Sequence, residues 1–131
     1  MENKKKAPDN LSHTPIVTVD YENKDYAKPT DAKFLSIGCA TWTKHLQDKE
    51  KAYSAKVWRH TGEKWSRQSE ELPLWRVLDL AILLIATIKE KKSVLEEFVQ
   101  EPQKNKDLKD FIRNSPDVYE SRLEELKRLL E

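Results

Sequence analysis

The sequence predicts an α+β fold, in which a small antiparallel sheet of three to four strands packs on a buried central helix and amphipathic C-terminal helices follow. Three observations support this fold class. β-branched and aromatic residues alternate with others in the first half of the chain. From Leu74 onward the apolar residues recur with the period of a helix. Because the strands all precede the helices, the order is typical of α+β rather than alternating α/β proteins.

The bulk composition limits the class of protein. With 131 residues, we expect a mobile tail over residues 1–14 and a single domain over residues 15–131. A net charge of +1 lacks the basic excess of a dedicated nucleic-acid domain, so nucleic acid is an unfavoured partner. The most apolar run, residues 77–88, is shorter than the ~20 residues of a transmembrane helix, so no membrane is expected. The single cysteine, Cys39, excludes an intrachain disulfide and fits a cytoplasmic location.

The first two strands are predicted over residues 15–21 and 34–43. The first is short and rich in β-branched residues. In the second, neither alternation class is polar, which predicts a central strand covered on both faces. Gly38 within it marks a bulge or the close approach of a neighbouring backbone.

The next two strands, predicted over residues 53–60 and 63–68, form a hairpin around the sequence "RHTGE". A type I turn centred on His60 and Thr61, with Gly62 left-handed, is favoured, because a two-residue turn would need a positive φ at a β-branched residue. This register pairs Val57 with Trp65. It assigns the core face to Tyr53, Ala55, Val57 and Trp65.

Trp58 then falls on the opposite face with Lys56 and Lys64, whereas the competing register joins it to Trp65. An exposed Trp58 among lysines would resemble the basic-aromatic platforms that stack bases. A covered Trp58 would be packing, which is the usual role of a large aromatic residue in a small domain.

Helices are predicted over residues 73–91, 93–100, 106–113 and 116–130. Pro73 suits the first turn of the first helix, which is apolar all round and should be buried on more than one side. Ser93 and Glu96 have capping-box spacing, and Ser115 with Pro116 marks the last helix start.

Aromatic and charged side chains gather between residue 56 and the first helix. The possible binding surface comprises Lys56, Trp58, Arg59, His60, Lys64, Arg67, Glu70, Glu71 and Asp79. Structural roles explain several of these residues. Acidic side chains ahead of a helix complement its dipole, and a carboxylate inside an apolar helix needs a partner such as Arg76, Arg59 or Arg67.

Familiar catalytic constellations are missing from the sequence. Its three histidines, at positions 13, 45 and 60, lack metal-ligand spacing, and Cys39 reads as a buried, inert thiol. Two glycines cannot build a phosphate-binding loop. We therefore predict no catalytic residue, cofactor or metal.

Two segments carry a resemblance to a known family. The segments "TDAKFLSIGCATW" and "SAKVWRHTGEKWSRQSEELPLWRVLDLAILL" resemble a family of small bacterial proteins that is defined as a domain of unknown function. The resemblance extends from about Thr30 to Ile88. It implies a bacterial, cytoplasmic origin and supplies no substrate, cofactor or catalytic residue.

Three functions remain open at this stage. We favour a non-catalytic binding or interaction domain that uses the hairpin of residues 56–71 and the following helix start, with an unknown protein partner or self-association through the C-terminal helices. The alternative is a small enzyme with an acid/base or anion-binding site around Arg59, His60, Glu70, Glu71 and Asp79. A second alternative is weak nucleic-acid binding by the basic-aromatic hairpin.

Overall fold

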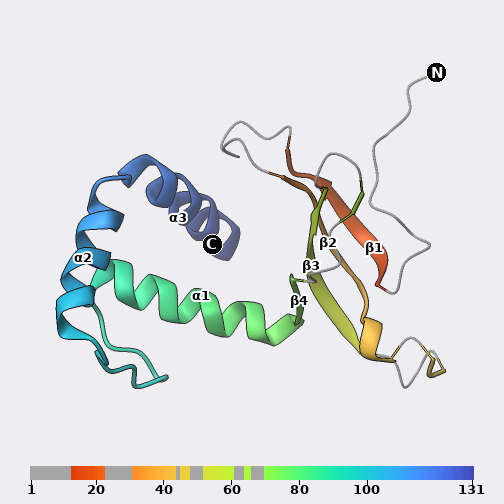
Figure 1. Cartoon of the computed structure of the whole chain (residues 1–131), viewed down its shortest axis with the longest axis horizontal. Helices are drawn as coiled ribbons and strands as arrows, with labels where there is room; N and C mark the ends of the chain where they lie inside the picture. Colours follow the sequence, from red (N-terminus) through yellow and green to blue (C-terminus); the bar gives the residue numbers. More distant parts are fainter. Residues whose placement is uncertain (1–12, 23–30, 44, 48–51, 61–63, 66–69) are drawn as a thin grey trace. The chain divides into compact units, whose positions relative to one another are not determined.

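The computed structural model describes residues 13–22, 31–43, 45–47, 52–60, 64–65 and 70–131. Within these residues it contains a four-stranded antiparallel sheet and three α-helices, so the α+β fold class is confirmed (Figure 1). Its contacts divide the chain into two compact units, Met1–Leu78 and Asp79–Glu131. The single-domain expectation for residues 15–131 stays a prediction.

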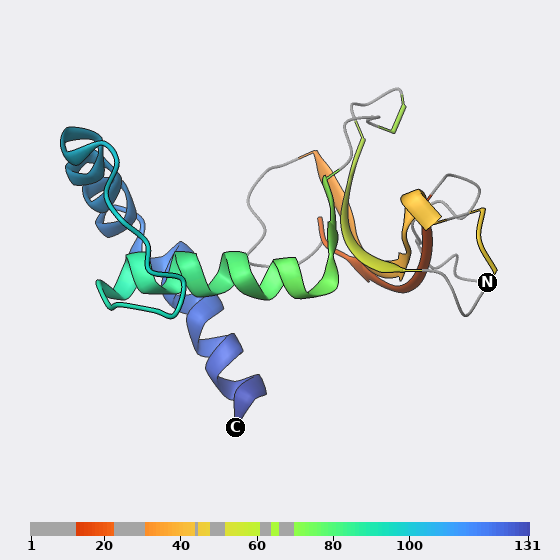
Figure 2. The same cartoon turned by 90° about the horizontal axis from the view of Figure 1, so that it is seen from below.

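The first unit is the sheet, with the strand order β1-β2-β3-β4. Its strands are β1 (Thr14–Asp20), β2 (Ala32–Cys39), β3 (Tyr53–Arg59) and β4 (Glu70–Pro73). The longer strands curve strongly, as Figure 2 shows from below. β2 lies between β1 and β3, so its central position is confirmed, and a 3₁₀ turn over Thr41–Thr43 follows it. The expected cover on both of its faces is wrong, because Ile37 is 45 % exposed.

Gly38 allows β1 to approach β2 closely, which confirms one of its two predicted roles. A Cβ at this position would lie 2.7 Å from the Cα of Pro15 and would also collide with the backbone carbonyl of Thr14. The pairing of β1 with β2 shifts between Pro15 and Val17, so the bulge is in β1 rather than at Gly38. Thr14 therefore belongs to the sheet, and residues 1–12 of the expected mobile tail lie outside the described part.

The aromatic core lies on the face of the sheet opposite to the one predicted. Trp58 is 2 % exposed and packs with Phe34, and Trp65 covers both. Trp65 pairs with His60 rather than with Val57, so the favoured hairpin register is wrong. Because antiparallel partners point to the same face, this pairing brings Trp65 to Trp58, with 5.9 Å between ring centroids. Residues 61–63, which would define the turn, lie outside the described part.

β4 was not predicted. The segment of Glu70 and Glu71 was expected to lead into the helix, but it pairs with β3 from Val57↔Glu70 to Ser54↔Pro73. Pro73 is the last residue of this edge strand, a position that tolerates a missing N–H. The predicted strand 63–68 is described only at residues 64 and 65, and 66–69 lie outside the described part.

Helix α1 (Leu74–Lys89) begins and ends close to its predicted bounds, but its predicted burial on more than one side is not confirmed. Among its described residues Ala86 alone is buried, and Trp75 and Leu78 are exposed. The described core cluster consists of aromatic residues of the sheet unit. α1 ends where Glu90 adopts a φ of 54° and Lys91 donates its N–H to the carbonyl of Ala86, 3.0 Å away.

The second unit also contains α2 (Pro102–Arg113) and α3 (Pro116–Leu130). The start of α3 after Ser115 is confirmed. The predicted helix over 93–100 is wrong: Ser93 accepts the N–H of Leu95 in a turn, and Glu96 has a φ of 50°. α2 begins at Pro102, ahead of the predicted start at residue 106, and ends at the predicted residue 113. Ion pairs of Lys109 with Glu90 (2.8 Å) and of Lys89 with Glu120 (3.4 Å) join the three helices.

Candidate functional site

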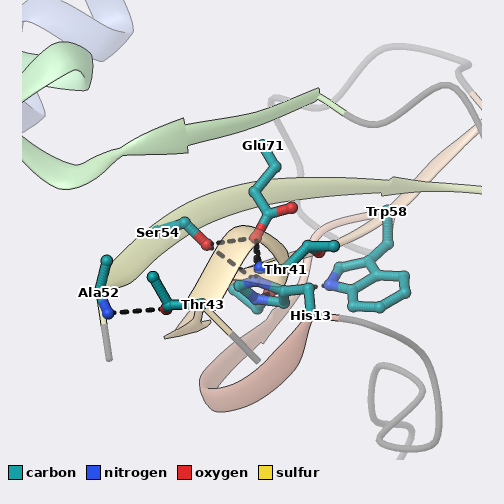
Figure 3. A network of polar contacts seen from close by, with 8 residues as sticks. His13, Thr41, Thr43, Ala52, Ser54, Trp58 and Glu71 are labelled. Atoms are coloured by element: carbon teal, nitrogen blue, oxygen red, sulfur yellow. Dashed lines mark hydrogen bonds and ion pairs between the residues drawn. The ribbon is translucent and has the colours of Figure 1, made fainter. Parts of the chain in front are cut away.

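A buried polar network is built on the aromatic face of the sheet, with His13 at its centre (Figure 3). His13 directly precedes β1 and is 0 % exposed, because the close approach of β1 to Gly38 carries its ring over the sheet. The ring meets the edge of Trp58 at 5.7 Å between centroids. A residue expected in a mobile tail is therefore one of the most enclosed side chains in the described structure.

Glu71 is the acceptor on which the network converges. Its Oε1 lies 3.0 Å from Nδ1 of His13, 2.7 Å from Oγ of Ser54 and 2.8 Å from the backbone N of Thr41. Its side chain is 6 % exposed. One carboxylate on β4 thus accepts three hydrogen bonds. They come from β3, from the 3₁₀ turn and from the residue that precedes β1.

Ser36 occupies the other side of the imidazole. Its Oγ accepts the indole N–H of Trp58 at 2.8 Å and lies 3.1 Å from Nε2 of His13. Because the carboxylate of Glu71 can only accept, the hydrogen of the neutral imidazole lies on Nδ1, and Nε2 then accepts the hydroxyl hydrogen of Ser36. The neutral Nδ1–H tautomer therefore satisfies every donor in the chain from Trp58 to Glu71.

The electrostatics agree with this assignment. Removal from water lowers the pKa of His13, and this effect outweighs the hydrogen bond and charge of Glu71, which raise it. Desolvation acts on Glu71 in the opposite sense, but the hydrogen bonds from Thr41, Ser54 and His13 together lower its pKa. The network thus favours a neutral imidazole beside an ionised carboxylate.

The order of Ser36, His13 and Glu71 is that of a hydroxyl, an imidazole and a carboxylate in a hydrolytic triad. A nucleophile must reach its substrate, however, and Ser36 is 5 % exposed with its oxygen already engaged by Trp58. His13 and Ser54 are fully buried. The arrangement therefore fits a structural clamp better than a catalytic site.

The predicted surface residues around Trp58 do not form a basic-aromatic platform. Trp58 is buried, as the packing interpretation expected, and Nζ of Lys56 lies 4.4 Å from the centre of its ring. Burial lowers the pKa of Lys56, and Glu71 opposes this shift. Lys64 is exposed, and Arg67 lies outside the described part.

The residues of the alternative enzyme site serve separate contacts. The guanidinium of Arg59 holds the carboxylate of Asp31, with distances of 2.8–3.1 Å, and its hydrogen bonds lower the pKa of Asp31. The ring of His60 packs on Trp65 at 4.9 Å between centroids. Glu71 belongs to the buried network, and Glu70 lies in β4.

Asp79 is half-buried in α1 and is the first residue of the second compact unit. Within the part of the chain that the structure describes, it has no hydrogen-bond or ion-pair partner. The expected pairing with Arg76 is therefore not found among the described residues, whereas a pairing with Arg59, which belongs to the other compact unit and holds Asp31, stays a prediction. A pairing with Arg67 falls outside the described residues.

The opposite face of the sheet carries an apolar groove of about 340 Å³. Val17 and Ile37 are 58 % and 45 % exposed there. The pairs Leu35↔Val57 and Ile37↔Ala55 form its floor. The residues that line the groove come from all four strands and the start of α1, and they are Val17, Val19, Leu35, Ser36, Ile37, Ala55, Lys56, Val57, Leu72 and Val77.

The described residues at the two ends of this face carry paired charges or no charge. At one end, Lys33 is paired with Glu22 at 2.7 Å, and Arg59 is paired with Asp31. At the other end, the register places Cys39 opposite Tyr53. The described residues that line the groove therefore offer mainly apolar contact.

Sequence reasoning missed the buried network and the groove. Ser36 and Ser54 were the available signal, because each lies in phase with a buried aromatic residue, Phe34 or Trp58. A polar side chain on a core face requires a hydrogen-bond partner, but the sequence does not say that His13 and Glu71 supply it.

The structure adds two negative findings for the described residues. No group of three or more His, Cys, Asp or Glu side chains lies close enough together to hold a metal ion there. Each helix in the described part is also too short or too polar to cross a bilayer.

Comparison with known proteins gives one match. A model for a family of unknown function (DUF6530) matches residues 5–96, which include the whole sheet, the buried network and α1. Neither a curated protein nor a solved structure matches the chain.

Proposed function

Since the chain belongs to this family of unknown function, its role has to be sought in its own surfaces, and we propose that it is a non-catalytic binding domain. The groove on the open face of the sheet takes the apolar side chains of a protein partner. The observation that carries this proposal is the contiguous aliphatic lining with Val17 and Ile37 exposed. Apolar patches of this kind mark interaction sites on protein surfaces.

The location overlaps the surface favoured from the sequence, although its chemistry is different. Val57 of β3, Leu72 of β4 and Val77 of α1 contribute to the groove, so the segment of residues 56–71 and the helix start both take part. Apolar contact replaces the exposed tryptophan and cations that the sequence suggested. A cytoplasmic location, which fits the single cysteine, is part of the proposal, and self-association through the C-terminal helices stays a prediction.

The groove can be tested with an apolar fluorescent probe, 1-anilinonaphthalene-8-sulfonate, and a synthetic leucine-rich amphipathic peptide as competitor. Ile37→Gln places an amide in the groove at a partly exposed position and is expected to weaken probe binding several-fold. The matched control is Leu130→Gln, at a residue that is 86 % exposed near the end of α3. Equal binding by the wild type and Ile37→Gln, or failure of the peptide to compete, would contradict the proposal.

A further inference from the structure

β4 connects the two faces of the sheet, because consecutive strand residues point to opposite sides. Glu71 enters the buried network, whereas Leu72 lines the groove. The strand is four residues long and lies at the edge of the sheet, where β3 is its one neighbour among the described strands. The bonds of Glu71 to His13, Ser54 and Thr41 are therefore a substantial part of what holds Leu72 in place.

We infer that His13 is a pH-sensitive latch, which holds β4 against the sheet when its imidazole is neutral and loosens β4 when the imidazole is protonated. The latch regulates the groove that Leu72 lines, and this part of the inference rests on the proposed function.

The reason for the release lies in the directions of the hydrogen bonds. A proton on Nε2 would face Ser36, whose oxygen already accepts from Trp58 and whose own hydrogen would lose its acceptor. Such an arrangement leaves a buried donor unsatisfied, which is costly.

The charged groups around His13 have opposing effects on the protonation of its imidazole. Glu71 attracts an imidazolium, whereas Lys56 repels it and the exclusion of water disfavours it more strongly than Glu71 favours it. Because the closed site binds a proton more weakly than a water-exposed imidazole does, protonation shifts the population toward the open state, which binds the proton better. The open state exposes His13 and removes one of the three donors to Glu71.

The test is amide hydrogen exchange of the full chain at pH 7.5 and 5.5, expressed as protection factors so that the intrinsic effect of pH is removed. The amides of β4 and of the chain around Thr14 are expected to lose protection, by at most about tenfold per pH unit, relative to the amides shared by β2 and β3. His13→Asn keeps an N–H donor for Glu71 but does not titrate, so its protection should not change between the two pH values. His45→Asn, at an exposed histidine, should behave like the wild type.

An NMR titration of the His13 ring in the wild type provides a measurement that does not depend on a folded variant. The ring is expected to titrate below the ordinary histidine pKa of about 6.5, together with the loss of β4 protection. Titration at or above that value, or protection that is unchanged by pH, would overturn the latch.

Probe binding separates the latch from the proposed function. The part of the binding that depends on Ile37 should weaken at pH 5.5 in the wild type and not in His13→Asn. If the amide protection of β4 depends on pH but no probe binding depends on Ile37, the groove is refuted and the latch is supported. If probe binding depends on Ile37 but the amide protection of β4 does not depend on pH, only the latch is refuted.

Discussion

Gly38 is the residue on which the placement of His13 depends most directly. A methyl group there would press on the backbone of Thr14 and Pro15, which cannot rotate away as a flexible side chain could. We expect Gly38→Ala to cost about 1–3 kcal/mol of unfolding free energy and to move His13 away from Glu71. Urea unfolding measures the loss. Cys39→Ala, at the neighbouring half-buried residue, is the control, and an equal effect of both variants would show that the close approach is unimportant.

The contacts of single residues were harder to predict from the sequence than the positions of strands and helices. The packing role of Trp58 could be predicted because large aromatic residues usually serve a core, and its 2 % exposure confirms it. Its face could not be predicted, because the register depends on the pairing of His60 with Trp65 across a turn. The place of His13 in the buried network could not be predicted, because its partners, Ser36 and Glu71, are 23 and 58 residues away in the chain.

At the scale of elements, the connection between α1 and α2 contains a residue in a strained conformation. Glu96 has a φ of 50°, which costs a residue with a Cβ about 1–2 kcal/mol, and glycine adopts it freely. Glu96→Gly is expected to raise the unfolding free energy by about 0.5–1 kcal/mol, after the larger unfolded-state entropy of glycine is subtracted. Thermal unfolding tests this gain. Lys92→Gly in the same connection should be destabilising, and a similar loss in both variants would contradict the prediction.

Periodicity predicted the elements whose stability comes from regular patterns. The strands β1 and β3 and the helices α1 and α3 lie close to their expected bounds, whereas β2 ends at Cys39 rather than at residue 43. β4 was missed because two glutamates and a proline have poor strand propensity, and distant donors to Glu71 compensate for it. The helix expected over 93–100 failed for the opposite reason, since a local turn at Ser93 satisfies the groups that a capping box would have used.

At the scale of the whole molecule, the family match and the two compact units have different boundaries. The first unit ends at Leu78, whereas the match continues to residue 96 and stops before α2 begins at Pro102. Every residue of the buried network and of the groove lies inside the match. The features on which both proposals rest therefore belong to the part of the chain that defines the family.

The stability of the whole chain should depend on pH in two separate steps. Folding lowers the pKa of His13, so the unfolded chain binds the proton more strongly, and stability falls as the pH drops below about 6.5 toward the lowered pKa. Folding also lowers the pKa of Glu71, so its contribution is present above its ordinary pKa near 4.5 and disappears as the pH falls through the lowered value. One differing proton changes the unfolding free energy by at most about 1.4 kcal/mol per pH unit.

Urea unfolding at half-unit intervals from pH 8 to 3 separates these steps. The wild type should lose stability in both windows, because His13 and then Glu71 take up protons on unfolding. His13→Asn should be less stable at pH 8 and flat through the upper window, since its amide does not titrate, and then fall with the carboxylates in the lower one. Asp31 and other carboxylates with lowered pKa values add to the lower window, so the upper window alone reports His13. A decline of equal size in His13→Asn and the wild type between pH 6.5 and 5 would assign that step to another group and remove His13 from the acid response.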